Sequence, residues 1–211
     1  TAANTNLPAG ECLAGNEGAV IELPAGSAIA LTEVDNGANA LPVVARPVTI
    51  RGHGARIERD PGLACPAGPE FRLFEVADGG ILTLEDLAVS NGCLALGSGA
   101  GVFSDGGSLV LREASIEGNE AGAAGGGVAL VGGNVLAFDS SVRGNLASGE
   151  GGGISVTGSP GWMLLERTTL SENVAASGGG LAISGSGRAL VGNSTFSGNV
   201  AASSGGGLEL A

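Results

Sequence analysis

Three acidic residues recur at nearly equal intervals along the chain, and their carboxylates are the first candidates for chemistry. They are Asp86, Glu113 and Asp139. Gathered carboxylates bind Ca²⁺ or act as general acid and base in glycoside hydrolysis. A similar spacing leads on to Arg167 and Asn193. We treat the three acids as weak metal-ligand candidates; the alternative is that they are solvated residues of a bend, with Arg112 or Arg143 as counter-charges.

Other catalytic signatures are weak. The chain has one histidine, His53, in the turn-like string "GHG". A lone turn histidine is more typical of a solvated side chain than of a nucleophilic triad. Trp162 in "GSPGW" is the one tryptophan available as a sugar-stacking platform. We therefore predict no catalytic residue and no cofactor.

Composition and charge restrict the class of protein. The 211 residues include 41 glycines, yet 43% are hydrophobic and only 3% aromatic, so a core must be built from aliphatic side chains. The formal net charge is −12, and every basic residue is arginine. Such acidity argues against binding of nucleic acid or of an anionic membrane. No apolar run is long enough to insert into a membrane, and we expect an extracellular or bacterial cell-surface location.

An internal repeat defines the elements that must position these residues. Glycine triplets recur at steps of 26, 27 and 27 residues, at 125–127, 151–153, 178–180 and 205–207. Within each unit apolar residues alternate with polar ones, as in "SLVLREASIEGN", which is strand periodicity. One unit cannot bury its apolar face, whereas stacked units can. We predict an all-β fold, a right-handed, three-faced parallel β-helix with about three short strands in each coil of about 26–27 residues.

Alignment of the units predicts four apolar columns that face the core. In coil order, these are Val102, Val128, Ile154, Leu181, Leu208; Leu82, Leu109, Val135, Met163, Ala189; Leu84, Leu111, Ala137, Leu165, Val191; and Val89, Ile116, Val142, Leu170, Phe196. Leu111, Leu165 and Val191 of the third column should point inward. Arg112 and Glu166, which follow Leu111 and Leu165 in the chain, should point outward.

One asparagine recurs in every unit, and we assign it a structural role. The column is Asn119, Asn145, Asn173 and Asn199. Stacked asparagines can hydrogen-bond to one another and to the backbone. Asparagine also tolerates the left-handed conformation that a sharp corner needs. The glycine triplet is expected to supply positive φ at another corner.

A small polar column is predicted on an outer face, at Ser115, Ser141, Thr169 and Thr195. Regular threonine arrays occur on ice-binding solenoids, but Glu117 and Arg143 interrupt the neighbouring column. A solvated strand face is the favoured interpretation.

The first part of the chain departs from the repeat. We divide a single domain into residues 1–42, an irregular N-terminal cap or first coil, and residues 43–211, the β-helix. Cys65 and Cys93 lie 28 residues apart, close to one coil, so they should stack within disulfide range. We predict a Cys65–Cys93 bridge that pins the loop "DPGLACPAGPE". Cys12 is left either free or able to displace one partner.

The alternation of "GGGV", "GGGI" and "GGGL" with "FSGN" (196–199) resembles the repeats of polymorphic outer membrane proteins. These are autotransporter adhesins of the pectate-lyase-like β-helix superfamily. Segments 48–59 and 71–92 also resemble the leading coils of bacterial surface proteins, so the resemblance covers roughly residues 43–211. Only one of four FxxN-like positions carries phenylalanine; the others are Ile116, Val142 and Leu170.

The resemblance implies a structural or adhesive extracellular β-helix whose partner is a host or surface glycan or protein. The alternative is a polysaccharide-active enzyme, a lyase or hydrolase, because the superfamily contains both. The sequence ends within a further coil, "GGGLELA". An open parallel edge is a template for another chain. Either the sequence is part of a longer solenoid, or its open edge is covered by a partner. If that partner is another copy, head-to-tail stacking into a filament is expected, with residues 1–15 lying across the last coil of the next copy.

Overall fold

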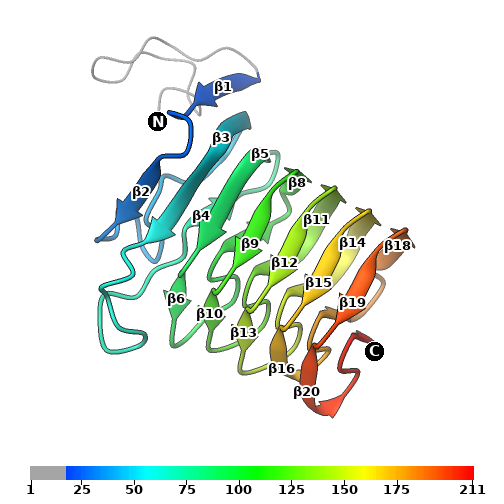
Figure 1. The fold of residues 1–211 in the computed structure, drawn as a ribbon. Helices are drawn as coiled ribbons and strands as arrows, with labels where there is room; N and C mark the ends of the chain where they lie inside the picture. The colour runs from blue at the N-terminus through cyan, green and yellow to red at the C-terminus, as the bar shows by residue number, and fades with distance from the viewer. Residues whose placement is uncertain (1–17) are drawn as a thin grey trace.

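The computed structural model describes residues 18–211, which form one stack of parallel strands (Figure 1). These residues contain strands, turns and bends but no helix. Every pairing between the named strands is parallel, and each strand pairs with its counterpart one coil further along the chain. The parallel β-helix predicted from the repeat is confirmed.

The strands divide naturally by coil. The first three coils contain β1 (Ala19–Glu22), β2 (Ala28–Leu31), β3 (Pro47–Arg59), β4 (Phe74–Val76), β5 (Ile81–Ser90) and β6 (Cys93–Leu94). The next two contain β7 (Val102–Asp105), β8 (Ser108–Arg112), β9 (Ser115–Glu117), β10 (Glu120–Ala121), β11 (Val128–Phe138), β12 (Ser141–Arg143) and β13 (Leu146–Ala147). The last contain β14 (Ile154–Glu166), β15 (Thr169–Ser171), β16 (Val174–Ser177), β17 (Leu181–Ile183), β18 (Arg188–Gly192), β19 (Thr195–Ser197), β20 (Val200–Ser204) and β21 (Leu208–Leu210).

The complete coils that start at β11 and β14 have three strands each, as predicted. The coil that starts at β7 has four, because its first strand is divided into β7 and β8 before β9 and β10 follow. The last strand of several coils is very short, since β6, β10 and β13 are only two residues long. These short strands form their own five-stranded sheet with β16 and β20.

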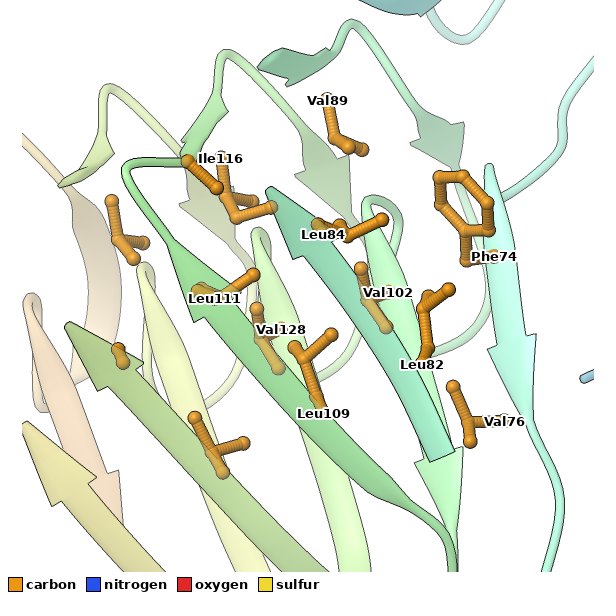
Figure 2. Packing of buried hydrophobic residues seen from close by; sticks show 14 of the residues in the cluster. Phe74, Val76, Leu82, Leu84, Val89, Val102, Leu109, Leu111, Ile116 and Val128 are labelled. Carbon is orange, nitrogen blue, oxygen red and sulfur yellow. The ribbon is translucent and has the colours of Figure 1, made fainter. Parts of the chain in front are cut away.

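The four predicted apolar columns match the strand register throughout. Val128 pairs with Val102 and Ile154, and the other columns pair in the same way. Figure 2 shows Leu82, Leu84 and Leu109 among the side chains that fill the space between the strands. Leu111 and Leu165 are fully buried. Since this core consists of aliphatic layers one strand spacing apart, burial of each layer depends on the coils on both sides.

Val191 is an exception to the inward prediction, because it is 40% exposed. It occupies the predicted column and pairs with Leu165. However, β18 is the last strand of its column in the structure, so no further coil covers its side chain. The register was therefore predicted correctly, whereas the burial was not.

The outer face of one sheet contradicts the predicted alternation of apolar and polar residues. Between the inward residues of β8, β11, β14 and β18 lie Val110, Leu136, Leu164 and Leu190. Leu190 is 63% exposed and the other three are partly exposed. This stack carries aliphatic side chains on both faces, a pattern that a search for period-two alternation does not anticipate.

The glycine triplet has the corner role predicted for it. Gly125 has φ of +63°, and Gly151, Gly178 and Gly205 repeat this left-handed conformation one coil apart. The third glycine meets a different constraint. A Cβ on Gly127 would lie 2.7 Å from the carbonyl oxygen of Gly153. The triplet thus combines a left-handed turn with close approach of successive coils.

Residues 18–31 stack on the next coil. Strands β1 and β2 both pair in parallel with β3, at Ala19 to Val48 and Ala28 to Arg56. A hollow of about 230 Å³ opens beside them, lined by apolar side chains that include Ile21, Ile29 and Phe74. The division at residue 42 stays a prediction, because residues 1–17 lie outside the described part of the chain.

Leu165→Asp should unfold the domain, because it places a charge without a partner in a fully buried layer. Such burial is destabilising by several kcal/mol, on the order of half or more of a typical domain stability. Leu164→Asp is the matched control, since Leu164 is on the outer face of the same strand. Circular dichroism melts at low protein concentration should show a folded control and an unfolded Leu165 variant; equal melting temperatures would contradict the register.

Candidate functional site

The predicted acidic residues lie in a corner column where the 16-stranded sheet bends. All its members have left-handed backbone conformations with φ between +47° and +51°: His53, Asp86, Glu113, Asp139, Arg167 and Asn193. The corner joins the end of one strand segment to the start of the next, as Glu113 joins β8 to β9. The recurrence of Asp86, Glu113 and Asp139 is therefore the recurrence of a bend.

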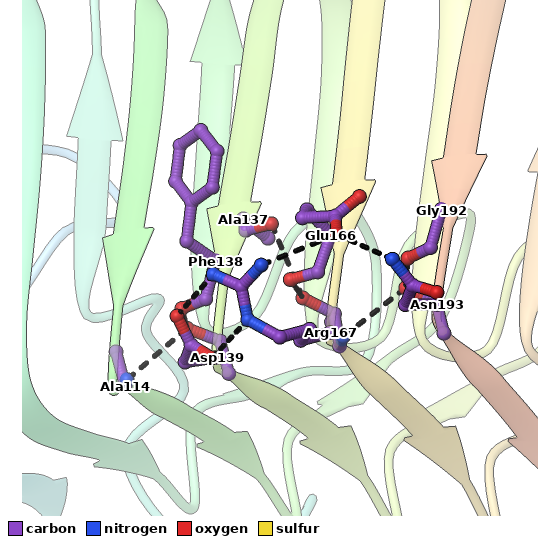
Figure 3. Close-up of polar contacts among 11 residues, drawn as sticks. Ala114, Ala137, Phe138, Asp139, Glu166, Arg167, Gly192 and Asn193 are labelled. Carbon is purple, nitrogen blue, oxygen red and sulfur yellow. Dashed lines mark hydrogen bonds and ion pairs between the residues drawn. The ribbon is translucent and has the colours of Figure 1, made fainter.

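Asp139 is paired with Arg167 of the next coil (Figure 3). Arg167 Nε lies 2.6 Å from Asp139 Oδ1, and Nη2 lies 2.8 Å from Oδ2. The hydrogen bonds from this guanidinium lower the pKa of the Asp139 carboxyl. Neither predicted counter-charge is used here, since Arg112 stacks on Phe138 and Arg143 bonds to Glu117. The one-coil step explains the outcome, because Arg167 follows Asp139 directly in the corner column.

Asp86 and Glu113 line a surface hollow of about 340 Å³. Its other lining residues are Arg51, His53, Glu85 and Arg112. Neither Asp86 nor Glu113 forms an ion pair with another described residue. Yet within residues 18–211 no three His, Cys, Asp or Glu side chains are grouped to hold a metal ion. The three weak metal candidates are thus spread along the corner rather than gathered around one point.

His53 belongs to a chain of charges at the edge of this hollow. Its Nε2 lies 2.8 Å from Glu22 Oε2, while Arg51 bridges Glu22 and Glu85. The contacts with His53 first, and with Arg51 second, lower the pKa of Glu22. These side chains are largely exposed, so the contacts tie β1 to β3 at the surface. The sequence predicted a solvated histidine and did not identify Glu22 as its partner.

The asparagine column forms a continuous ladder inside the next corner. Asn119 donates from both its backbone N and its Nδ2 to Asn145 Oδ1, each at 3.0 Å. Asn145 and Asn173 repeat these two bonds to the next rung. Each Nδ2 also donates to a carbonyl of the previous coil, as Asn145 does to Ile116. The first three rungs are at most 1% exposed, so the ladder satisfies polar groups within the interior.

The left-handed turn beside the ladder is made by the preceding residue, contrary to expectation. Positive φ occurs at Gly118, Gly144, Glu172 and Gly198, not at the asparagines. The reason is that the asparagine side chain must point inward to reach the next rung, so the chain reverses one position earlier. The third glycine of the triplet leaves room for the inward asparagine side chain, since a Cβ on Gly127 would lie only 3.0 Å from Asn145 Cγ.

The serine and threonine column is found on the outer face of β9, β12, β15 and β19, in the predicted register. Ser141 Oγ donates to Ser115 Oγ at 3.1 Å. Glu117 and Arg143 interrupt the neighbouring column and are bonded to each other at 2.8 Å. This ion pair divides the small polar side chains and prevents a uniform array.

Cys65 and Cys93 form a disulfide whose Cα atoms are 5.9 Å apart. Sequence reasoning missed the second tie of the same loop. Arg59 is only 2% exposed and donates to the carbonyls of Leu63, Ala64 and Pro69. Its burial lowers its pKa. The clue in the sequence was an arginine at a strand end directly before a proline-rich loop. Cys12 lies outside the described residues.

Trp162 is in strand β14 rather than in a turn. It is 52% exposed, and the Arg188 guanidinium lies 5.9 Å from its ring centre. The extra residues of the "GSPG" segment produce a register shift between β11 and β14, after which pairing resumes. Trp162 therefore belongs to the outer sheet face and not to the charged corner.

Asn145→Ala should destabilise the domain by about 3 kcal/mol. It removes the acceptor of two donors on Asn119 and leaves buried groups without partners, which is destabilising by roughly 1–3 kcal/mol for each group. Asn134→Ala, which loses one partly buried bond to Ser108, is the matched control and should change stability by less than about 1 kcal/mol. Urea unfolding measures both; equal effects would mean that the ladder is dispensable.

The Asp139 carboxyl should titrate below its ordinary range because Arg167 favours its charged form. Since the folded pKa is lowered, the stabilisation by this pair is present above the unfolded pKa. It is lost as pH falls through the folded pKa. In Arg167→Gln, carbon-detected NMR should show the Asp139 pKa returning toward its ordinary value. Arg143→Gln should leave it unchanged; an unchanged value in both variants would exclude the pairing.

Comparison with known families matches a short part of the repeat. Residues 193–209 match the Chlamydia polymorphic membrane protein repeat. The matched stretch includes β19, the ladder residue Asn199 and the glycine triplet that precedes β21. No curated protein and no solved structure matches the chain significantly, and no helix of the described residues is long and apolar enough to span a membrane. The chain is a parallel β-helix that carries a repeat of the polymorphic membrane protein type, a repeat of bacterial surface proteins.

Proposed function

We propose that this chain is a rigid extracellular β-helix that acts as a structural or adhesive part of a bacterial surface protein. The observation that carries the proposal is the continuous parallel pairing of the coils. From β7 onward each strand segment pairs with its counterpart, and pairing resumes after the register shifts at the "GSPG" segment and between β16 and β20. A solenoid built in this way presents long, regular faces and transmits force along its axis through backbone hydrogen bonds.

The surface-protein repeat supports this role. The matched residues are those that build the corners and the ladder, so the match concerns the scaffold and not an added site. The disulfide supports an extracellular setting, because such bonds persist in an oxidising environment. Together with the buried Arg59 it fixes the loop between β3 and β4. The ligand class that we propose for an adhesive role is a host or surface glycan or protein.

A polysaccharide-active enzyme is the second candidate, and one observation favours it. The hollow beside Asp86 and Glu113 brings two carboxylates without ion pairs next to the Arg112 guanidinium. Hydrolysis of a glycoside would use one carboxyl as acid and the other as base or nucleophile. Elimination would instead need a base to remove a proton from the sugar ring.

Head-to-tail stacking remains a separate proposal. The described coils end in apolar surfaces: the hollow beside β1 and β2 at one end, and Leu208 and Leu210 at the other. Because both surfaces are apolar, the end of one copy can pack against the start of the next. The segment expected to mediate the contact, residues 1–15, lies outside the described residues.

A sugar-cleavage assay separates the two functions. The purified chain is incubated with pectin-like and other glycan panels, with and without Ca²⁺, and the release of reducing or unsaturated ends is measured. We expect no release above that of the unfolded Leu165→Asp variant. If the chain is adhesive, the Asp86→Asn and Glu113→Gln variants should still bind to immobilised glycans and host-cell layers. Turnover that these two variants abolish while they remain folded would favour the enzyme.

A further inference from the structure

The outer face of the sheet formed by β5, β8, β11, β14 and β18 carries three rows of side chains, one residue from each strand. The central row begins with Thr83 and continues with four apolar residues, Val110, Leu136, Leu164 and Leu190. The first flanking row is Ile81, Ser108, Asn134, Trp162 and Arg188, and the second is Glu85, Arg112, Phe138, Glu166 and Gly192. We call this surface the three-row face.

The three-row face is unusual for so acidic a chain. Ile81, Trp162 and Leu190 are 39%, 52% and 63% exposed. Leu136 and Leu164 are partly exposed between them. Single exposed apolar residues are ordinary, but a continuous apolar row across four strands is typical of a surface that another molecule covers. The charges in the second flanking row then determine which molecule fits.

We propose that the three-row face binds a second copy of this chain, face to face, about a two-fold axis that runs along β11. Such an axis places each strand opposite the partner strand equally far from β11 on the other side. Leu136 then meets the partner's Leu136, and Val110 meets the partner's Leu164. In the second flanking row Phe138 meets the partner's Phe138. Arg112 meets the partner's Glu166, and this contact occurs twice because the interface is isologous.

The charge order of the second flanking row disfavours three neighbouring alignments, and the fourth, with the axis midway between β11 and β14, opposes Arg112 to the partner's Gly192 and so gains no ion pair. An axis along β8 would oppose Arg112 to the partner's Arg112, and an axis along β14 would oppose Glu166 to the partner's Glu166. An axis midway between β8 and β11 would oppose Glu85 to the partner's Glu166. With the axis along β11, Glu85 meets the partner's Gly192, so no like charges face each other. Arg112 stacks on the ring of Phe138 at 5.0 Å and makes no ion pair with another described residue. Glu166 already contacts Arg167 at 3.2 Å and accepts from Asn193 Nδ2 at 2.7 Å, so the contact with the partner's Arg112 adds to these.

The size of the face predicts a weak dimer. Five strands at a spacing of about 4.8 Å, each contributing about five residues of 3.3 Å, cover roughly 400 Å² on each copy. A total of roughly 800 Å² is below the size of stable interfaces and within the range of transient ones. The dimer should therefore form reversibly at high micromolar concentration, as suits chains held close together on one surface.

Charge reversal provides the test, by sedimentation velocity from about 10 µM to 1 mM at physiological salt. Wild type should shift from monomer to dimer over this range. Arg112→Glu and Glu166→Arg should each weaken self-association at least tenfold, because each variant opposes like charges to itself. Mixed in equal amounts, the two single variants should associate again, since each then faces the opposite charge on its partner. Arg143→Glu, on another face, is the matched control and should dimerise like wild type.

Thermal melts establish that every variant is folded, and Leu136→Glu tests the apolar row without the ion pairs. A wild type that stays monomeric at 1 mM overturns the proposal. So does an undiminished dimer of either single variant or of Leu136→Glu, or a mixture that remains monomeric. Growth beyond two copies that charge reversal does not affect would show end-to-end assembly instead, and would likewise overturn the face-to-face dimer.

Discussion

One constraint governs the stacked strands: nearly every strand residue lies beside its counterpart in the next coil, one strand spacing away. A side chain must therefore be compatible with its own column as well as with its neighbours in the chain. Aliphatic columns satisfy this by layering, and the buried asparagines satisfy it by donating to the next rung. Charges satisfy it by alternation, as in Glu22, Arg51 and Glu85. The same rule extends to the backbone, because the corner column repeats one left-handed conformation from His53 to Asn193.

This constraint explains why the register could be predicted from the sequence. In a parallel stack, alignment of repeats in the sequence is alignment in space, so the four apolar columns and the disulfide spacing followed directly. Orientation at the corners did not follow, because a one-residue difference separates Gly144, which turns, from Asn145, which points inward. The exposure of Val191 and the outward row of Leu136 and Leu164 depend on what covers a surface, and residue spacing does not carry that information.

For the candidate site as well, the sequence predicted the positions of the residues but not their side-chain contacts. Recurrence of Asp86, Glu113 and Asp139 correctly identified one column, but not the use that each member makes of it. Asp139 is held by Arg167, whereas Asp86 and Glu113 face a hollow beside Arg112. Pairing of this kind depends on which charge stands one coil further on and on the direction of long flexible side chains. Function on such a scaffold is therefore a matter of which outer columns are filled, since the inner columns are committed to stacking.

The ladder also bears on how chains of this type change length. The strings "NVAAS" at 173–177 and 199–203 occupy equivalent places on successive coils, beginning at ladder rungs. Exchange between two such copies at the level of the gene would remove or add one whole coil. Asn173 would then be followed directly by residues that already fit there, and all columns would stay in phase. Length can thus vary by single coils, in steps of about 4.8 Å, without any new packing problem. An insertion of another size keeps the later columns in phase only where pairing resumes after it, as it does after the "GSPG" segment.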